Sequence, residues 1–400
     1  MTELYPVLTD GNEMLLVGCS GDVTKICSDD HDQCNIFLWM DLDIAFNIDS
    51  FINDGILIVN DLSLRIDSWL KNIPYLNIKT FNDLNEIVEF IARCSKRYLE
   101  GKTVVLGYSG GKDSTAALIL IIKLMEYINI KLKVMYVYMP YMESIRNLKF
   151  VEQVGRKLGV NIEVVEPRRR YVKKMLKWLG LPRRGNRWCT YFKVRPIRKV
   201  VRGNPKVVEA VADRLFESPK RALRLIRRLK DGFIASEKKF TPVGFMPVID
   251  IMFLIKRYEL IHPAYIDGLP RVSCTLCPYK TLYEFNIKEP LEDPGFIDEV
   301  LLREYKKSYV YSKIPFEEFM SNALWRFKPN TALRLYRLKN KLRDYLSEGK
   351  ILSYDKVRRL HIMSWEQCDA VRRRVRNVEI NNLVNRVERA LNIWGFKSGL

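Results

Sequence analysis

The amino-acid sequence predicts an α/β fold in which helices flank a parallel sheet, with a small β-rich N-terminal module before it and a helical, basic C-terminal region after it. Short apolar runs separated by Asp, Asn and Gly characterise the N-terminal part, which is typical of small β modules. Strand-like apolar runs then alternate with helix-like periodicity. From about Pro290, apolar positions recur at three- and four-residue steps among many Lys and Arg. We therefore expect three domains, at residues 1–80, 81–285 and 286–400.

Length and charge narrow the function classes. The 400 residues exceed one average domain, and 67 Lys and Arg against 47 Asp and Glu give a formal net charge of +20. This excess indicates polyanionic partners, either nucleotides or nucleic acid; a basic surface without a partner is the alternative. No apolar run is long enough to span a bilayer, and no basic stretch precedes an apolar one at the N-terminus, so we expect a cytoplasmic protein without a membrane partner. In the cytoplasm, eight cysteines favour metal or redox chemistry over disulfides.

The N-terminal module is predicted from three short apolar runs, at residues 14–17, 35–39 and 55–59. A helix is expected next, over residues 80–99, because apolar side chains recur there at helical spacing after a polar start. This helix would lead into the central domain.

The central domain is predicted from alternating patterns. Strands are expected at residues 104–106, 133–138 and 162–165, and helices at 116–125 and 149–158. Strand–helix repeats at this spacing imply right-handed crossovers and a parallel sheet, which residues 207–211 extend as a further strand. Ligands of such sheets bind at the carboxyl ends of the strands.

A glycine turn follows the first of these strands and opens a helix, which makes an anion site. Glycine lets the backbone approach a ligand, the N–H groups at the helix start point towards it, and the helix dipole favours negative charge. Lysine adds a positive charge, and the serines add hydroxyl donors. The Walker pattern is absent. The loop residues are Ser109, Gly110, Gly111, Lys112, Asp113 and Ser114.

This hexapeptide resembles the pyrophosphate loop of the adenine-nucleotide α-hydrolase group, which includes the phosphoadenosine phosphosulfate (PAPS) reductase family and the ATP pyrophosphatases. Three later blocks resemble motifs of the PAPS reductase family, in the family's order. They are Arg187-Trp-Cys-Thr190 with Lys193, then Glu217-Ser218 with Arg221, then Arg271 with Cys274-Thr-Leu-Cys277-Pro278. The four motifs cover about residues 100–280, and the resemblance implies an adenine-nucleotide α-hydrolase-like fold.

The resemblance also implies a nucleotide site. The loop would hold the pyrophosphate of ATP, or the corresponding part of PAPS or adenylyl sulfate, with Mg²⁺ bridging phosphate oxygens and Asp113 as a candidate ligand. Cationic side chains would stabilise the charge that develops on the phosphates. These candidates are Lys112, Arg187, Lys193 and Arg271, and the residues expected to complete the nucleotide site are Glu217, Ser218 and Arg221.

The cysteines of the motifs suggest a metal. Cys274 and Cys277 are spaced to place two thiolates on one metal or cluster, or to form a dithiol redox pair. With Cys189 they could hold a [4Fe–4S] cluster in which one iron lacks a protein thiolate. Zinc, or three free thiols in a core, are the alternatives.

The C-terminal region is expected to be helical at residues 332–346 and 367–390, and 372–376 is its densest basic run. A tRNA or DNA surface is one interpretation, with Trp365 and Trp394 as stacking partners; a solvated helix face is the other.

The leading functional hypothesis is an ATP-dependent enzyme that adenylates an acceptor with release of pyrophosphate and transfers sulfur, on tRNA or DNA, with a sulfur-donor or reductant protein as a further partner. A PAPS or adenylyl sulfate reductase is the first alternative. Against it, cluster-containing adenylyl sulfate reductases carry adjacent cysteines, whereas Cys189 stands between Trp188 and Thr190. A nucleic-acid-binding protein with a regulatory nucleotide module is the second alternative.

Overall fold

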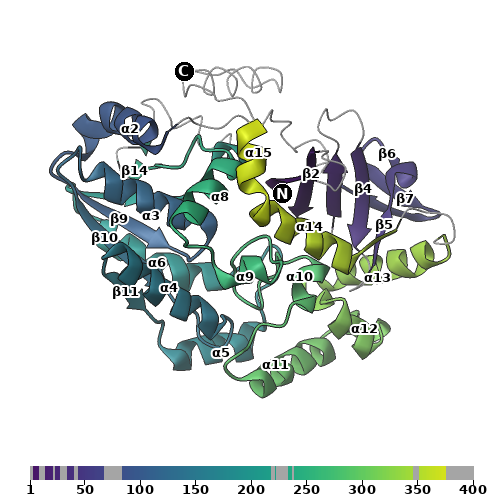
Figure 1. Cartoon of the computed structure of the whole chain (residues 1–400). Coiled ribbons are helices and arrows are strands. Elements are labelled where there is room, and N and C mark those ends of the chain that lie inside the picture. The colour runs from purple at the N-terminus through teal and green to yellow at the C-terminus, as the bar shows by residue number, and fades with distance from the viewer. Residues whose placement is uncertain are drawn as a thin grey trace.

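The computed structural model describes residues 3–8, 14–20, 23–27, 34–39, 44–66, 83–217, 221, 233–236, 238–345 and 351–374. Figure 1 shows an α/β unit on one side and a smaller antiparallel sheet on the other, with α14 and α15 between them. None of the described helices combines the length and the apolar character that crossing a bilayer requires.

The α/β unit is built on a six-stranded sheet. Five strands are parallel, and the last pairs antiparallel at the edge. The strand order is β11 (Ile162–Val165), β10 (Lys131–Val137), β9 (Thr103–Tyr108), β12 (Val207–Ala210), β14 (Lys239–Phe240) and β13 (Ile234–Ser236). The predicted parallel sheet flanked by helices is confirmed.

The two faces of this sheet are covered by different helices, as the alternation of side chains along a strand requires. Val104 and Leu106 of β9 belong to the large core that includes α2, α3, α4 and α8, whereas Val105 belongs to a smaller core with Val201 of α6. The helices are α2 (Leu84–Leu99), α3 (Lys112–Leu124), α4 (Ile145–Leu158), α5 (Arg169–Leu179), α6 (Cys189–Val201) and α8 (Val248–Arg257).

Two predicted helices of the central domain begin earlier than expected. The helix predicted from residue 116 begins at Lys112, because its first turn is polar and carries no apolar signal. The helix predicted from residue 149 begins after Ser144, whose side chain accepts the Arg146 N–H as an N-cap.

The antiparallel sheet combines both ends of the sequence. Its order is β1 (Glu3–Leu8), β2 (Met14–Ser20), β3 (Val23–Cys27), β4 (Cys34–Trp39), β5 (Ile44–Asn47) and β15 (Ile351–Ser353). A second small sheet contains β6 (Ile52–Asn53), β7 (Ile56–Val59) and β8 (Leu62–Arg65). Leu338 and Leu342 of α13 (Pro329–Arg343) pack in one core with Leu57 of β7. The domain limits at residues 80 and 285 stay a prediction.

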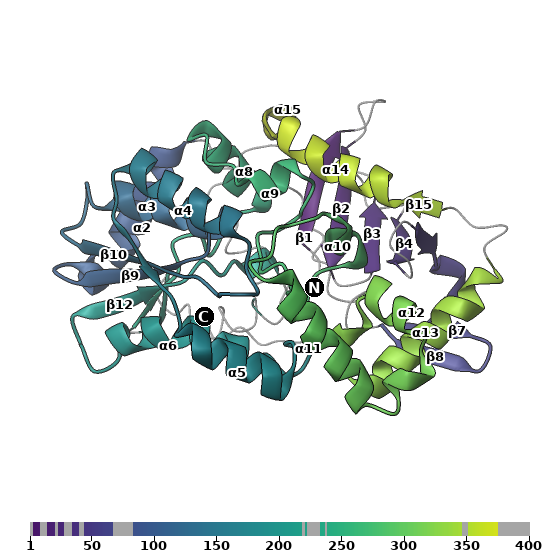
Figure 2. The same ribbon diagram turned by 90° about the horizontal axis from the view of Figure 1, so that it is seen from below.

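The remaining helices lie beneath and between the sheets (Figure 2). A separate apolar core joins α5 to α10, α11 and α12, and α14 and α15 both contact β1. These helices are α9 (Pro263–Ile266), α10 (Leu282–Asn286), α11 (Pro294–Lys307), α12 (Phe316–Ser321), α14 (Tyr354–Glu366) and α15 (Cys368–Arg374), with short 3-10 turns at Asp49–Phe51, Leu215–Glu217, Tyr311–Lys313 and Leu324–Arg326.

Candidate nucleotide and thiol site

The predicted phosphate loop, Ser109 to Ser114, joins β9 to α3 at the carboxyl edge of the parallel strands. β9 pairs with β10 on one side and β12 on the other, so the strand order reverses beside this loop, which is where open α/β sheets bind ligands. Gly110 has φ of +76°, a conformation that favours glycine. The Ser109 and Ser114 hydroxyls lie 2.9 Å apart, and the Ser114 hydroxyl donates to the Gly111 carbonyl at 2.9 Å. The turn is therefore held closed around the start of α3.

Two cationic side chains flank Asp113 in the first turn of α3. Lys112 Nζ lies 3.4 Å from Asp113 Oδ2, and Arg214 Nε donates to Asp113 Oδ1 at 2.5 Å. Lys112 and Arg214 are both buried. Burial, together with the charge of Arg221, lowers the pKa of Arg214 to about 9, so its guanidinium stays charged at neutral pH. Positive charge is thus concentrated where the helix begins, which favours an anion.

Arg214 also connects two predicted site residues to the loop. Glu217 Oε2 accepts the backbone N–H of Arg214 at 3.4 Å, and Arg221 forms an ion pair with Glu217. Glu217 and Arg221 therefore join the phosphate loop through Arg214 and Asp113, while Ser218 lies outside the described residues.

A second wall of the loop comes from α9. The Tyr265 hydroxyl accepts the Lys112 N–H at 2.8 Å. His262 Nδ1 accepts a backbone N–H at 3.0 Å, so the proton of the neutral ring is on Nε2. This Nε2 atom is buried without a hydrogen-bond partner among the described residues, and the neighbouring Cδ2 would lie 3.8 Å from a Cβ at Gly110. Burial lowers the pKa of His262 to about 4. A neutral N–H donor therefore lies beside the loop, and the part of the chain that the structure describes offers it no acceptor.

A separate polar cluster surrounds Glu143, which follows the carboxyl end of β10. Its carboxylate is buried and accepts the Tyr136 hydroxyl at 2.6 Å, Lys193 Nζ at 3.0 Å and the Asn147 amide at 3.2 Å. Cys274 Sγ lies 3.7 Å from Glu143 Oε2. Burial alone would raise the pKa of Glu143, but the Lys193 charge and these hydrogen bonds hold it below its ordinary value. The cluster is thus a buried carboxylate that pairs with a partly exposed lysine beside a thiol.

The three predicted cysteines lie within electrostatic reach of this ion pair and of one another. Burial raises the pKa of the Cys274 thiol, Lys193 opposes the rise, and Glu143 and the other two thiols add to it. Burial also raises the pKa of Cys189, against the charges of Arg187 and Lys193. Cys189 and Cys274 therefore both lie within electrostatic reach of Lys193, and Cys277 within reach of the other two thiols.

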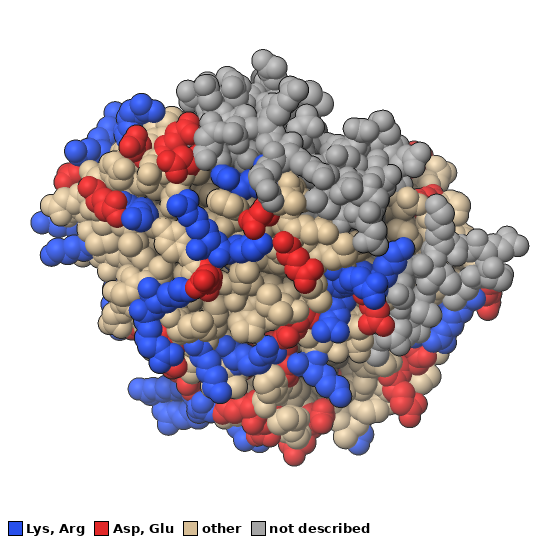
Figure 3. Space-filling model, in the orientation of Figure 1, with Lys and Arg blue, Asp and Glu red and all other residues tan. Residues whose placement is uncertain are grey.

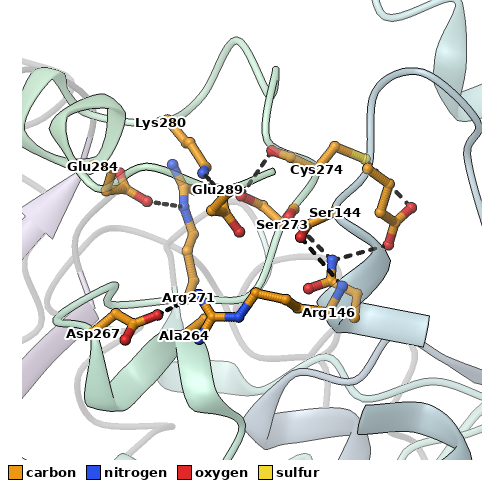
Figure 4. Close-up of polar contacts among 12 residues, drawn as sticks. Ser144, Arg146, Ala264, Asp267, Arg271, Ser273, Cys274, Lys280, Glu284 and Glu289 are labelled. Atoms are coloured by element: carbon orange, nitrogen blue, oxygen red, sulfur yellow. Dashed lines mark hydrogen bonds and ion pairs between the residues drawn. The ribbon is translucent and has the colours of Figure 1, made fainter. Parts of the chain in front are cut away.

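The two predicted arginines lie beside these thiols. The Arg187 guanidinium lies 5.1 Å from the centre of the Tyr279 ring. Arg271 Nε lies 3.3 Å from Glu284 Oε1 (Figure 4), and its Nη2 has no hydrogen-bond partner among the described residues. Burial lowers the pKa of Arg271, but Glu284 and Cys277 raise it more. Arg271 is therefore held charged next to the C-x2-C turn.

The phosphate loop and the thiols form one site, because a short segment touches both. The Cβ of Val272 would lie 3.8 Å from a Cβ at Gly111. Cys274, two residues later, contacts Glu143, and two residues span at most about 7 Å of chain. Figure 4 shows this segment beside Arg146 of α4, which pairs with Asp267 at 2.6 Å and ties α4 to the α9 segment.

Four residues that line this site were missed by the sequence interpretation: Glu143, Arg214, His262 and Tyr265. Arg214 lies three residues before Glu217 and His262 lies nine residues before Arg271, but nothing in their spacing marks them. Glu143 carries a weak signal, since a polar residue just after the carboxyl end of a parallel strand lies at the ligand edge.

The three thiols are suitable ligands for an iron–sulfur cluster, whereas the surroundings of Asp113 do not suit Mg²⁺. Three thiols with cationic neighbours suit thiolate ligation, although no three His, Cys, Asp or Glu side chains of the described residues are arranged to hold a metal ion. Both Asp113 oxygens are engaged by cationic side chains. No role is therefore assigned to Mg²⁺ at Asp113.

Comparison with known proteins finds a family match for the central part of the chain. Residues 103–280 match the family model described as the phosphoadenosine phosphosulfate reductase domain. An uncharacterized protein of Methanocaldococcus jannaschii is 28% identical over 289 residues, which cover 66% of this chain and 58% of that protein. The matched region thus spans less than two thirds of that relative's length.

Solved structures with similar folds are distant. The U34-tRNA thiolase NcsA from Methanococcus maripaludis, solved with its [4Fe–4S] cluster, is 14% identical with a TM-score of 0.35 and coverage of 65% of this chain and 80% of that chain. The NH3-dependent NAD synthetase of Campylobacter jejuni is 17% identical with a TM-score of 0.31 and coverage of 62% and 95%. At such scores none of these functions is transferred to the present chain.

Proposed function

We propose, on the premise that residues 103–280 belong to the phosphoadenosine phosphosulfate reductase domain family, that this protein is an ATP-dependent sulfur-transfer enzyme. It binds ATP at Ser109–Ser114, adenylates an acceptor with release of pyrophosphate, and replaces the activated oxygen by sulfur. We take the acceptor to be a base of an RNA, although the sequence favours neither tRNA nor DNA over the other.

The observation that carries this proposal is the position of Val272, which touches the phosphate loop two residues before Cys274. Thiols and a phosphate-binding loop that act on the same carbonyl group of an acceptor must lie this close. An inert nucleotide module has no need of a buried carboxylate, Glu143, that pairs with the partly exposed Lys193 and contacts Cys274, since burying a charged group costs desolvation energy.

The reaction balances in two steps. A carbonyl oxygen of the acceptor attacks the α-phosphorus of ATP, and the α–β bridging bond breaks to release pyrophosphate. A sulfide (HS⁻) from a donor then attacks the activated carbon, the C–O bond breaks so that the oxygen leaves on AMP, and the added sulfur loses its proton. The acceptor ends with sulfur in place of its oxygen. Stabilising the charge on the phosphates is the main requirement of the first step.

The residues divide between these steps. The backbone N–H groups at the start of α3 and the charges of Lys112 and Arg214 stabilise the leaving pyrophosphate. Glu217 and Arg221 orient Arg214. Burial raises the pKa of Cys274 and Cys189, and the charges of Lys193 and Arg187 oppose that rise. Arg271 adds a further positive charge beside Cys277. Cys189, Cys274 and Cys277 are the residues that would hold an iron–sulfur cluster, which would supply a binding site for the sulfur.

Reduction of PAPS or adenylyl sulfate is the alternative that the family name favours. It uses the same phosphate loop but attacks sulfur rather than phosphorus, and it requires an external reductant. The two reactions differ in products, since one yields AMP, pyrophosphate and a thiolated acceptor, and the other yields sulfite.

The first test is anaerobic purification followed by iron, sulfide and zinc analysis. We expect about four irons and four sulfides per chain in the wild type and their loss in Cys274→Ser. Cys94→Ser is the matched control, because Cys94 lies on α2 in the sheet core and should leave the metal content unchanged. Zinc alone, or no metal, would contradict the cluster.

The second test measures the products. The purified protein with ATP, tRNA and sulfide should release AMP and pyrophosphate in a one-to-one ratio and yield a thiolated nucleoside by mass spectrometry. Production of sulfite from PAPS with a dithiol reductant, without ATP cleavage, would overturn the proposal in favour of the reductase.

A further inference from the structure

The segment that follows β11 is basic and free of acidic residues, because no Asp or Glu occurs between Glu166 and Glu209. It contains α5 and α6. In Figure 3, drawn in the orientation of Figure 1, Lys and Arg gather along the lower left of the molecule, where Figure 1 draws α5. A single-signed surface of this kind attracts polyanions.

One face of α6 carries an exposed cationic stripe. Tyr191, Arg195, Arg198 and Arg202 are exposed and recur at steps of four, three and four residues, which places them on the same side of a helix. Lys199 lies next to the stripe and is also exposed. Within the described part of the chain, none of these four cations pairs with a carboxylate. Their charges are therefore available to a ligand.

Exposed aromatic rings accompany cations on both α5 and α6. Trp178 of α5 is 70% exposed and Tyr191 of α6 is 58% exposed. The Arg195 guanidinium lies 5.5 Å from the centre of the Tyr191 ring, and that of Arg170 lies 5.0 Å from the centre of the Tyr171 ring. Stacked arginine–aromatic pairs offer flat platforms for bases.

The two helices are connected next to the thiols. The Trp188 indole N–H donates to the Gly180 carbonyl at 3.2 Å, joining the start of α6 to the end of α5. α6 begins at Cys189, so its exposed stripe starts beside the thiol site. With a rise of about 1.5 Å per residue, Arg198 lies about 14 Å along the helix from Cys189.

The cations of the basic helix α13, unlike those of the α6 stripe, pair with carboxylates. Lys339 pairs with Glu318 at 2.7 Å, Arg343 lies 3.5 Å from the same carboxylate, and Lys341 pairs with Asp61. These charges are partly neutralised within the protein. Residues 375–400, which the sequence also marks as basic, lie outside the described residues.

We propose that the α5–α6 surface, defined by Arg170, Tyr171, Lys174, Trp178, Tyr191, Arg195, Arg198, Lys199 and Arg202, binds a single-stranded loop of an RNA and leads one base to the thiol site. This inference rests on the proposed function for the identity of the acceptor. Cations along a helix fit the phosphates, and the exposed rings fit unstacked bases, which only single-stranded segments provide.

The test of the charges uses the full chain and a fluorescent single-stranded RNA of about 20 nucleotides. The variant Arg195→Glu/Arg198→Glu/Lys199→Glu should weaken RNA affinity by about tenfold or more at low salt, and should lower the slope of log affinity against log salt by about 2 to 3. The matched control Arg93→Glu/Lys96→Glu/Arg97→Glu changes the net charge equally on α2, where all three are exposed, and should change affinity by about threefold or less.

The test of the rings uses Trp178→Ala and Tyr191→Ala. Each should weaken RNA affinity by about fivefold or more while leaving the salt slope unchanged, since stacking involves no counterion release. A DNA duplex of about 20 base pairs should bind more weakly than the RNA and should not respond to the ring variants.

Equal losses for the α6 and α2 variants, or tighter binding of the duplex than of the RNA, would overturn the inference. ATP binding is measured in parallel and should stay unchanged in every variant. Loss of RNA binding with intact ATP binding supports the surface even if no thiolated product forms, so failure of the proposed reaction can be told apart from failure of this inference.

Discussion

His262 shows how much of the site depends on one atom. Its Nδ1 accepts a backbone N–H as the N-cap of α9, and its buried Nε2–H has no acceptor among the described residues beside the phosphate loop. Leaving a buried donor unsatisfied costs about 1–3 kcal/mol. A phosphate oxygen of the bound nucleotide would remove that cost, so we expect His262 to donate to it.

The variant His262→Asn tests this role. Asparagine keeps an N-cap acceptor but does not reach to the Nε2 position. A hydrogen bond to a charged group contributes about 1.5–3 kcal/mol, so ATP should bind about 10- to 100-fold more weakly by calorimetry. The thermal midpoint without nucleotide serves as the control for folding. Unchanged ATP affinity would contradict the assignment, and wild-type affinity should show no histidine titration between about pH 5 and 8, because the pKa is about 4.

At the scale of elements, α6 depends on a glycine in the strand beneath it. A Cβ at Gly107 of β9 would lie 2.8 Å from Ile197 Cδ1 of α6. The missing side chain lets α6 approach the sheet, and α6 carries Cys189 and Lys193 to the site. The geometry of the thiols therefore depends on a contact far from their motifs in sequence.

Gly107→Ala should lower the free energy of unfolding by about 1–3 kcal/mol, because the interface has no room for a methyl group without a shift of Ile197. Gly295→Ala is the control. Nothing lies within 4 Å of a Cβ at Gly295, and its φ is not positive, so alanine in α11 should stabilise by about 0.5–1 kcal/mol. Urea denaturation measures both. Equal effects of the same sign would show that packing at Gly107 does not matter.

Individual helices and strands also show which parts of the fold could be predicted from the sequence. The strands of the central sheet follow from apolar runs, and the phosphate loop and the C-x2-C turn follow from local spacing. The start of α3 could not be found from periodicity, because Lys112 to Thr115 carry polar or functional side chains. Local hydrophobic patterns predict helices and strands, but they miss the first turn of a helix when its side chains are polar residues of a binding loop.

At the scale of the whole molecule, the site is assembled by contacts between distant residues. Asp113 meets Arg214, Lys112 meets Tyr265, and Cys274 meets Glu143, pairs separated by 101, 153 and 131 residues. Likewise β15 joins the N-terminal sheet beside β5. Hydrophobic periodicity does not specify which loops meet, so the motifs predicted the cysteines and the loop but not the residues that connect them.

Burial of two of the three histidines predicts how the whole protein responds to acid. Burial lowers the pKa of both His262 and His361 to about 4, whereas the unfolded chain has a histidine pKa of about 6.5. Between these values the unfolded state binds more protons, so the free energy of unfolding falls as the pH falls from about 6.5 to about 4. Each histidine contributes about 1 kcal/mol of loss by about pH 5.5, and about 3 kcal/mol at most.

Urea unfolding measured from about pH 7 to pH 5 tests this expectation, since ordinary carboxylates titrate below that window. The double variant His262→Asn/His361→Asn will be less stable at neutral pH, because it loses buried packing and the Tyr283–His361 hydrogen bond of 2.9 Å. Its stability should nevertheless be nearly independent of pH in this window. A double variant that keeps the wild-type pH slope would place the acid sensitivity in other groups.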